Sequence, residues 1–167
     1  MLHDDVLAHA TDLVAHLKLA RLKLVTAESC TGGLVAAAIT DVAGSSEVFE
    51  RGFVTYSNEA KTASLGVSPA LLADYGAVSA PVAVAMAEGA LRHSHADIAV
   101  AITGIAGPGG ATATKPVGLV HIAVARNGSP TVEQECHFTN AGRRKVREAA
   151  VREALGMVGC AVAVEQK

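Results

Sequence analysis

The residues best suited to chemistry lie in two short stretches of the 167-residue sequence. The first, residues 26–33, contains hydroxyls, a thiol and two glycines, and it separates the apolar runs 22–25 and 34–39. This pattern predicts a buried strand, a turn and a helix. Backbone N–H groups at a helix N-terminus favour an anion or an oxygen on which negative charge develops. Ser29 is therefore a candidate nucleophile for a carbonyl group; the alternative is that Ser29 and Thr31 only cap the helix.

The second stretch, residues 56–61, places Tyr56 at a predicted strand end and Lys61 in the following helical turn. A serine nucleophile needs a base, and burial or neighbouring positive charge lowers the pKa of a lysine enough to make it one. A tyrosine within reach would relay a proton or bind an oxyanion. The alternative is a solvated Lys61. Histidines offer no better base, because those later in the chain fall in strand patterns or at a helix end: His93, His95, His121 and His137.

Two further features bear on the site. Cys30 is a second candidate nucleophile, because a thiol at a helix N-terminus has a lowered pKa. A glycine-rich loop at 104–110 follows the continuous apolar run 97–103, and open α/β sheets bind ligands at such strand ends. The loop matches neither the P-loop nor the dinucleotide-binding fingerprint, because the spacing and the Lys-Ser/Thr pair are missing.

Hydrophobic periodicity places these stretches on alternating helices and strands. Helices are predicted over 4–19, 34–39, 57–65, 68–75, 79–93 and 142–164, and strands over 23–27, 48–56, 97–103, 117–125 and 132–138. The pair Asn127-Gly128 predicts a hairpin, so the last two strands should be antiparallel. The fold class we expect is α/β, a three-layer α/β/α sandwich with a mixed sheet of about five strands, formed by residues 1–167 as a single domain.

Composition limits the classes of function. Half of the residues are hydrophobic and the formal charge is only −2, which favours a packed globular domain and argues against a nucleic-acid partner. The three cysteines have no metal-type spacing and indicate reduced thiols. The start Met-Leu-His-Asp-Asp is unlike a signal peptide, and no apolar run is long enough for a membrane span. We therefore expect a cytoplasmic protein without a membrane partner.

Five motifs in this order resemble the CinA C-terminal domain family: residues 27–33, 52–61, 65–67, 103–110 and 115–118. The resemblance covers nearly the whole chain. It implies an α/β/α domain, usually a homodimer, and a nicotinamide-nucleotide amidohydrolase (NMN deamidase) that needs no metal or cofactor. Its small-molecule substrate would be a pyridine nucleotide. In relatives the domain often follows a larger, molybdopterin-binding-like domain, whose activities we do not transfer to this chain.

The resemblance also implies residue roles. Ser29 would be the nucleophile, Lys61 the general base and Tyr56 the partner that positions or relays the proton. Substrate-binding roles are implied for Glu28, Cys30, Thr31, Gly32, Gly33, Thr103, Gly104, Gly107 and Arg143. In this scheme the N–H groups around Cys30 to Gly32 bind the oxyanion.

The nucleotide phosphate needs a cation, and Arg143 and Arg147, one helical turn apart, are candidates beside the alternative of a solvated face. Many relatives carry Gly-Asp-Arg where this chain has Ala141-Gly142-Arg143, so the arginine is retained and the aspartate is not. The rival hypothesis is a nucleotide-binding or competence-associated module without turnover, because glycine-rich loops bind anions equally well without catalysis.

Overall fold

A five-stranded mixed sheet forms the centre of the computed structural model, which describes residues 3–139 and 141–163. The strands are β1 (Leu24–Glu28), β2 (Phe49–Val54), β3 (Ile98–Gly104), β4 (Leu119–Arg126) and β5 (Val132–His137). They lie in the order β2-β1-β3-β4-β5. β1 pairs in parallel with β2 and β3, whereas β4 is antiparallel to both of its neighbours. The predicted mixed sheet, with a parallel part and a final antiparallel hairpin, is confirmed.

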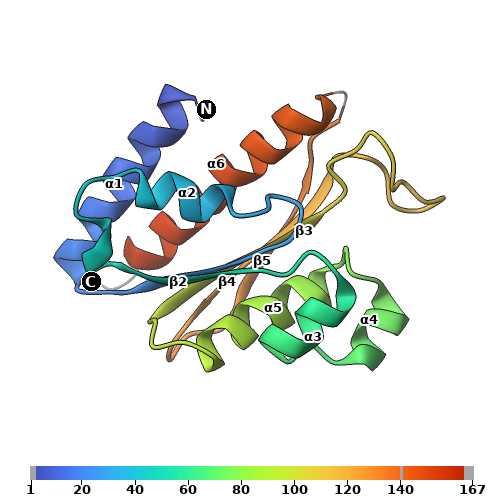
Figure 1. Cartoon of the computed structure of the whole chain (residues 1–167), viewed down its shortest axis with the longest axis horizontal. Helices are drawn as coiled ribbons and strands as arrows, with labels where there is room; N and C mark the ends of the chain where they lie inside the picture. The colour runs from blue at the N-terminus through green and yellow to red at the C-terminus, as the bar shows by residue number, and fades with distance from the viewer. Residues whose placement is uncertain (1–2, 140, 164–167) are drawn as a thin grey trace.

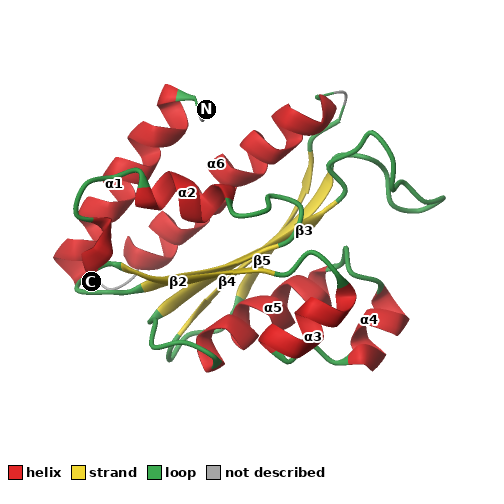
Figure 2. Cartoon of the chain, viewed as in Figure 1, coloured by secondary structure: helices red, strands yellow, loops and turns green. Residues whose placement is uncertain are grey.

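Helices cover both faces of this sheet, which completes the predicted three-layer sandwich (Figures 1 and 2). One face carries α1 (Asp4–Ala20), α2 (Leu34–Thr40) and α6 (Gly142–Ala163), and the other carries α3 (Asn58–Leu65), α4 (Pro69–Tyr75) and α5 (Ala80–Arg92). A short 3₁₀ turn, η1 (Ser45–Glu47), leads into β2. Predicted boundaries agree to within about two residues, except that Val164 at the end of the predicted last helix lies outside the described residues.

The two faces are filled differently because side chains alternate along a strand. Ile98, Val100 and Ile102 of β3 point into the core shared with α1 and α6, whereas Ala99 and Ala101 face α5. The small side chains on the α5 face let that helix approach the sheet closely. Six of the seven β3 residues are buried, as expected for a central strand with both faces covered.

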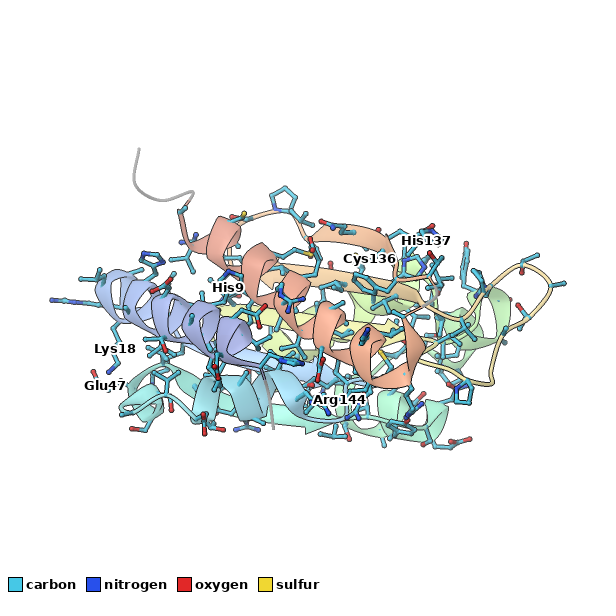
Figure 3. The ribbon with its side chains drawn as sticks, turned by 90° about the horizontal axis from the view of Figure 1, so that it is seen from above. His9, Lys18, Glu47, Cys136, His137 and Arg144 are labelled. Atoms are coloured by element: carbon cyan, nitrogen blue, oxygen red, sulfur yellow. The ribbon has the colours of Figure 1, made fainter. Side chains whose placement is uncertain are left out.

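Ion pairs lie at the surface of the outer helices. Figure 3 shows α1 and α6 lying next to each other across one face. At the end of α1, Lys18 Nζ lies 3.0 Å from a carboxylate oxygen of Glu47 in η1 (Figure 3). On α6, Arg144 pairs with Glu148 one turn later. Of the described helices, none has both the length and the apolar character needed to cross a membrane.

The parallel strands end at one edge of the sheet, and this edge positions the candidate site. Thr55 N–H donates to the Glu28 carbonyl at 2.8 Å, and Ser29 N–H donates to the Ile102 carbonyl at 2.9 Å. These bonds hold the ends of β2, β1 and β3 together just beyond the last ladder pairs. The segments that follow the three strands therefore start side by side.

Candidate active site

Ser29 lies in a tight turn between β1 and α2, residues 29–33, called the serine turn below. Gly32 and Gly33 have φ angles of 61° and 96°, a conformation that side chains with a Cβ rarely adopt. Gly32 N–H donates to the Ser29 carbonyl at 3.1 Å, which closes the turn. The serine side chain is left at the edge of the sheet with about 9% of the residue exposed.

Glu28 has a different role from the substrate contact that the resemblance implies. It is fully buried, and its carboxylate oxygens accept hydrogen bonds from the N–H groups of Gly33, Val35 and Ala36 at 2.9–3.1 Å. These N–H groups at the start of α2 have no acceptor within the helix, so Glu28 caps it. The interpretation of Ser29 and Thr31 as helix caps is therefore wrong, because Glu28 supplies the cap from the preceding strand. Neither a free carboxylate oxygen nor a free Gly33 N–H faces the cavity.

Lys61 reaches Ser29 from the first turn of α3. Ser57 Oγ caps that helix by accepting from Ala60 N–H at 3.1 Å, which directs Lys61 inward. Only 1% of Lys61 is exposed, and Nζ lies 3.0 Å from Ser29 Oγ and 2.9 Å from the Thr55 carbonyl oxygen. An ammonium donates to both oxygens, whereas a neutral amine donates to Thr55 and accepts the serine O–H. The predicted Ser-Lys pair is therefore within hydrogen-bond reach.

Burial shifts the pKa of the candidate base, Lys61, and of the second candidate nucleophile, Cys30. Desolvation lowers the pKa of the Lys61 amine below its usual 10.5, which favours the basic, neutral form. Desolvation also raises the pKa of the Cys30 thiol to about 11. A thiol with this pKa stays protonated near neutral pH and is a poor nucleophile. The geometry and the pKa shifts therefore favour Ser29 over Cys30.

The serine turn offers a hydrogen-bond donor beside Ser29. Within the described residues, the N–H groups of Gly32, Gly33 and Leu34 all have acceptors. The N–H groups of Cys30 and Thr31 have no acceptor in another described residue, although the Cys30 N–H lies close to its own thiol. Of these two residues only Cys30 lines the cavity described below, so the donor expected over residues 30–32 is the N–H of Cys30. A backbone N–H next to a nucleophile is a donor of the kind that stabilises a developing oxyanion.

Ser29 and Lys61 open onto a cavity of about 260 Å³. Its wall includes Cys30, Tyr56, Thr103, Gly104, Gly107 and Arg143 among the predicted residues, whereas Glu28, Thr31, Gly32 and Gly33 do not line it. Larger hollows exist, among them a 490 Å³ groove between α3 and α4, but the serine and lysine meet at the smaller one. Unpredicted lining residues are Ala77 and Val78, which precede α5 and carry no chemical signal in the sequence.

The strand-end residues shape this wall through packing. Thr103 Oγ1 donates to the Ala77 carbonyl at 2.8 Å, which joins the segment before α5 to β3. A Cβ on Gly104 would lie 2.7 Å from a methyl carbon of Val120, so β4 requires glycine there. Gly107 has a φ of 81° in the long loop after β3, which extends away from the sheet (Figure 1).

Arg143 and Tyr56 meet at the mouth of the cavity. Arg143 Nη2 donates to Tyr56 Oη and Nη1 donates to the Gly107 carbonyl oxygen, each at 2.9 Å. Tyr56 is 60% exposed and, among the described residues, bonds neither Lys61 nor Ser29. The proton-relay position predicted for Tyr56 is therefore not the one observed. A guanidinium has five N–H donors, so Arg143 keeps donors for an anion.

Arg147 does not join Arg143 at the cavity. Its Nη2 instead donates to the Thr31 carbonyl oxygen at 2.8 Å, behind the serine turn. Within the described residues, no group of three or more His, Cys, Asp or Glu side chains is arranged to hold a metal ion. All three cysteines are free, and Cys30 and Cys136 are buried.

Comparison with protein families agrees with this architecture. The CinA C-terminal domain model matches residues 7–161, and the chain belongs to this family. A CinA-like protein of Akkermansia muciniphila is 60% identical over 119 residues, 71% of this chain and 29% of that protein. A putative competence-damage inducible protein of Caldicellulosiruptor saccharolyticus is 54% identical over 138 residues, 82% of this chain and 33% of that protein. The chain thus spans about a third of the length of these curated relatives.

Solved structures share the fold over nearly their whole length. The competence/damage inducible protein CihA from Agrobacterium tumefaciens has a TM-score of 0.94 and 47% identity, covering 97% of this chain and 98% of that one. A CinA superfamily protein from Escherichia coli has a TM-score of 0.88 and 36% identity, covering 95% and 92%. The predicted family and fold class are confirmed.

Replacing Glu28 by Ala should lower the free energy of unfolding by about 3 kcal/mol, because one buried and two part-buried N–H groups lose a charged acceptor. Urea unfolding monitored by circular dichroism measures the change. Glu47→Ala is the matched control: its exposed pair with Lys18 should contribute less than about 1 kcal/mol. Equal stability of Glu28→Ala and the parent would contradict the capping role.

Lys61→Met should change how stability depends on pH. As pH rises through the lowered pKa of Lys61, the folded protein releases a proton that the unfolded chain keeps until about pH 10.4, so the parent gains stability there. The gain is at most about 1.4 kcal/mol per pH unit. Below this interval Lys61→Met should be the more stable protein, because it avoids burying an ammonium.

The difference in unfolding free energy between the two proteins, measured by urea titration from about pH 6 to about pH 10, tests this sign. Both proteins should carry Cys30→Ala, because the raised pKa of Cys30 makes stability fall at high pH and its charge interacts with that of Lys61. A difference that is constant over the whole range would show that burial does not alter the proton affinity of Lys61.

Proposed function

We propose that this chain is a nicotinamide-nucleotide amidohydrolase that converts nicotinamide mononucleotide to nicotinic acid mononucleotide and ammonia. The observation that carries the proposal is the buried Lys61 amine, 3.0 Å from Ser29 Oγ at the wall of a cavity. Family membership agrees with it, and the resemblance of the sequence motifs suggests the substrate. Structural relatives are named only as competence or damage-inducible proteins, so the reaction is our inference.

Acylation starts with proton transfer from Ser29 to Lys61. Neutral Nζ accepts the Oγ proton while Oγ forms a bond to the carboxamide carbon, and the carbonyl electron pair moves onto oxygen. Burial supports this step because it disfavours the ammonium and makes the amine a base. The Thr55 carbonyl holds Nζ in place throughout, since it accepts one of its N–H groups.

In this scheme the tetrahedral oxyanion is stabilised by the N–H group of Cys30, which lines the cavity and has no acceptor in another described residue. Collapse of this intermediate breaks the C–N bond, and the Lys61 ammonium returns its proton to the nitrogen, which leaves as ammonia. A water molecule then attacks the acyl-serine with Lys61 as base, and the proton passes back to Ser29 Oγ. Each step uses the same amine, alternately as base and acid.

Substrate orientation follows from the charges around the cavity. Its small volume suits the pyridine ring and carboxamide, while the nucleotide phosphate would lie at the mouth beside Arg143. In this scheme Tyr56 acts on substrate indirectly: its hydroxyl accepts from Arg143 and fixes the guanidinium plane. The loop carbonyl of Gly107 fixes it from the other side.

Ammonia release from nicotinamide mononucleotide tests the proposal. Ser29→Ala and Lys61→Met should each lower kcat about 10,000-fold, because nucleophile and base act as one unit. For the parent, kcat/KM should rise with pH through the lowered pKa of Lys61 and then level off, since only the neutral amine is a base.

Cys30→Ala is the matched control, because it removes the neighbouring thiol and keeps the backbone N–H; it should retain activity within about tenfold. Activity that survives in Ser29→Ala and is lost in Cys30→Ala would transfer the nucleophile role to the thiol. Tight calorimetric binding of the nucleotide without ammonia release would favour a binding module. If the chain neither binds the nucleotide nor releases ammonia from it, a pyridine-nucleotide role is refuted.

The reaction's setting, in our proposal, is a cytoplasmic homodimer. The family resemblance suggests the dimer, and three free, widely spaced cysteines suit a reducing compartment. Light scattering of the purified chain should give twice the mass of one chain. A monomer at micromolar concentration would contradict the dimer and leave the amidohydrolase proposal standing, because all the residues it uses lie in one chain.

A further inference from the structure

Arg147 is a cation of α6 that the proposed reaction does not use. It follows Arg143 by one helical turn, yet its guanidinium contacts the back of the serine turn and not the cavity. Nη2 donates to the Thr31 carbonyl at 2.8 Å, and the side chain is half-buried. A Cβ on Gly32 would lie 3.6 Å from the same nitrogen, so the guanidinium packs closely against this turn.

The hydrogen bond from Arg147 starts a continuous chain that ends at a donor beside the nucleophile. The carbonyl of Thr31 and the N–H of Gly32 belong to one peptide unit. Gly32 N–H donates to the Ser29 carbonyl at 3.1 Å, and that carbonyl shares a peptide unit with the N–H of Cys30. The Cys30 N–H has no acceptor in another described residue, and Cys30 lines the cavity. Two peptide units therefore link the guanidinium to a donor next to Ser29 Oγ.

If the side chain at position 147 only filled space, a guanidinium would be less favourable there than an apolar group. Arg147 Nε is buried and has no hydrogen-bond partner among the described residues, and the same holds for Thr31 Oγ1. A buried donor without an acceptor destabilises the folded protein, and an apolar side chain of similar length would avoid this. The contribution of Arg147 therefore lies in its charge and in the bond to Thr31.

We propose that Arg147 is a positioning residue that acts through these two peptide units to orient and polarise the Cys30 N–H toward the reacting oxygen. The inference rests on the proposed amidohydrolase reaction. Hydrogen bonds in a chain strengthen one another, and a charged donor at one end makes the N–H at the other end a better donor. Its effect is greatest when negative charge develops on the substrate oxygen, so Arg147 stabilises the transition state more than the bound substrate.

Kinetics of Arg147→Met test the proposal. We expect kcat for nicotinamide mononucleotide to fall about tenfold, less than the loss of a whole oxyanion donor, with KM changed less than about twofold. Arg147→Lys keeps the charge and one donor to the Thr31 carbonyl, so its kcat should lie between those of Arg147→Met and the parent. Lys145→Met is the matched control: it removes one charge from the exposed side of the same helical turn and should leave both constants unchanged.

A second readout does not require turnover. In ¹H–¹⁵N NMR spectra, the amide protons of Gly32 and Cys30 should move to higher field in Arg147→Met, because a weaker hydrogen-bond chain shields them. Lys145→Met should leave them in place. If the parent releases no ammonia, the proposed function fails, and these resonances still decide whether the chain of peptides transmits the charge of Arg147.

Three outcomes would overturn the proposal. One is an unchanged kcat in Arg147→Met. Another is a rise in KM alone, which would make Arg147 a substrate contact. The third is that the Gly32 amide resonance moves in Arg147→Met and the Cys30 amide resonance does not. The effect of Arg147 would then not pass beyond the Ser29 carbonyl. If Arg147→Met does not fold, the same three criteria apply to Arg147→Lys.

Discussion

The structure depends most on a lysine amine held almost without water beside a serine. Burial disfavours an ammonium in this position, and among the described residues its hydrogen-bond partners are two oxygens, Ser29 Oγ and the Thr55 carbonyl oxygen. The pKa of the amine is therefore lowered, so the neutral form that can act as a base is favoured. The same burial makes the site a source of instability, so the surrounding framework has to be rigid. Backbone bonds between the ends of β1, β2 and β3 supply that rigidity.

Glu28 is the second part of this framework. It lies one residue before the serine and uses its carboxylate on three N–H groups of α2, so strand, turn and helix form one hydrogen-bonded unit. The N–H groups of Gly33, Val35 and Ala36 donate to Glu28, whereas that of Gly32 donates to the Ser29 carbonyl. Among the described residues, the N–H groups of Cys30 and Thr31 have no acceptor in another residue. Which N–H groups of the turn lack an acceptor depends on backbone geometry more than on side-chain identity.

Much of the fold could be predicted from the sequence, because periodicity and turn residues mark the elements directly. The continuous apolar run at 97–103 became β3, and Asn127-Gly128 preceded the antiparallel β5. The sequence makes Ser29 and Lys61 candidates because each is a reactive residue type in a turn that follows a predicted strand. The functions of Glu28 and Tyr56 could not be found this way: the direction of a side chain at a turn depends on which backbone groups lack partners. Arg147 was likewise placed near phosphate, since a helical pattern does not say which neighbour a helix face meets.

The loop between the antiparallel strands β3 and β4 forms part of the cavity wall but carries neither Ser29 nor Lys61. This loop contributes Gly107, Gly109 and Gly110 to the cavity wall, yet both of its ends are fixed to neighbouring strands. Lengthening a loop whose ends are already adjacent has a small entropic effect. Insertions there would reshape the cavity while Ser29 and Lys61, which lie on other connections, stay in register. Members of this fold can thus diverge in ligand choice by growth of a single hairpin loop, without rebuilding the sheet.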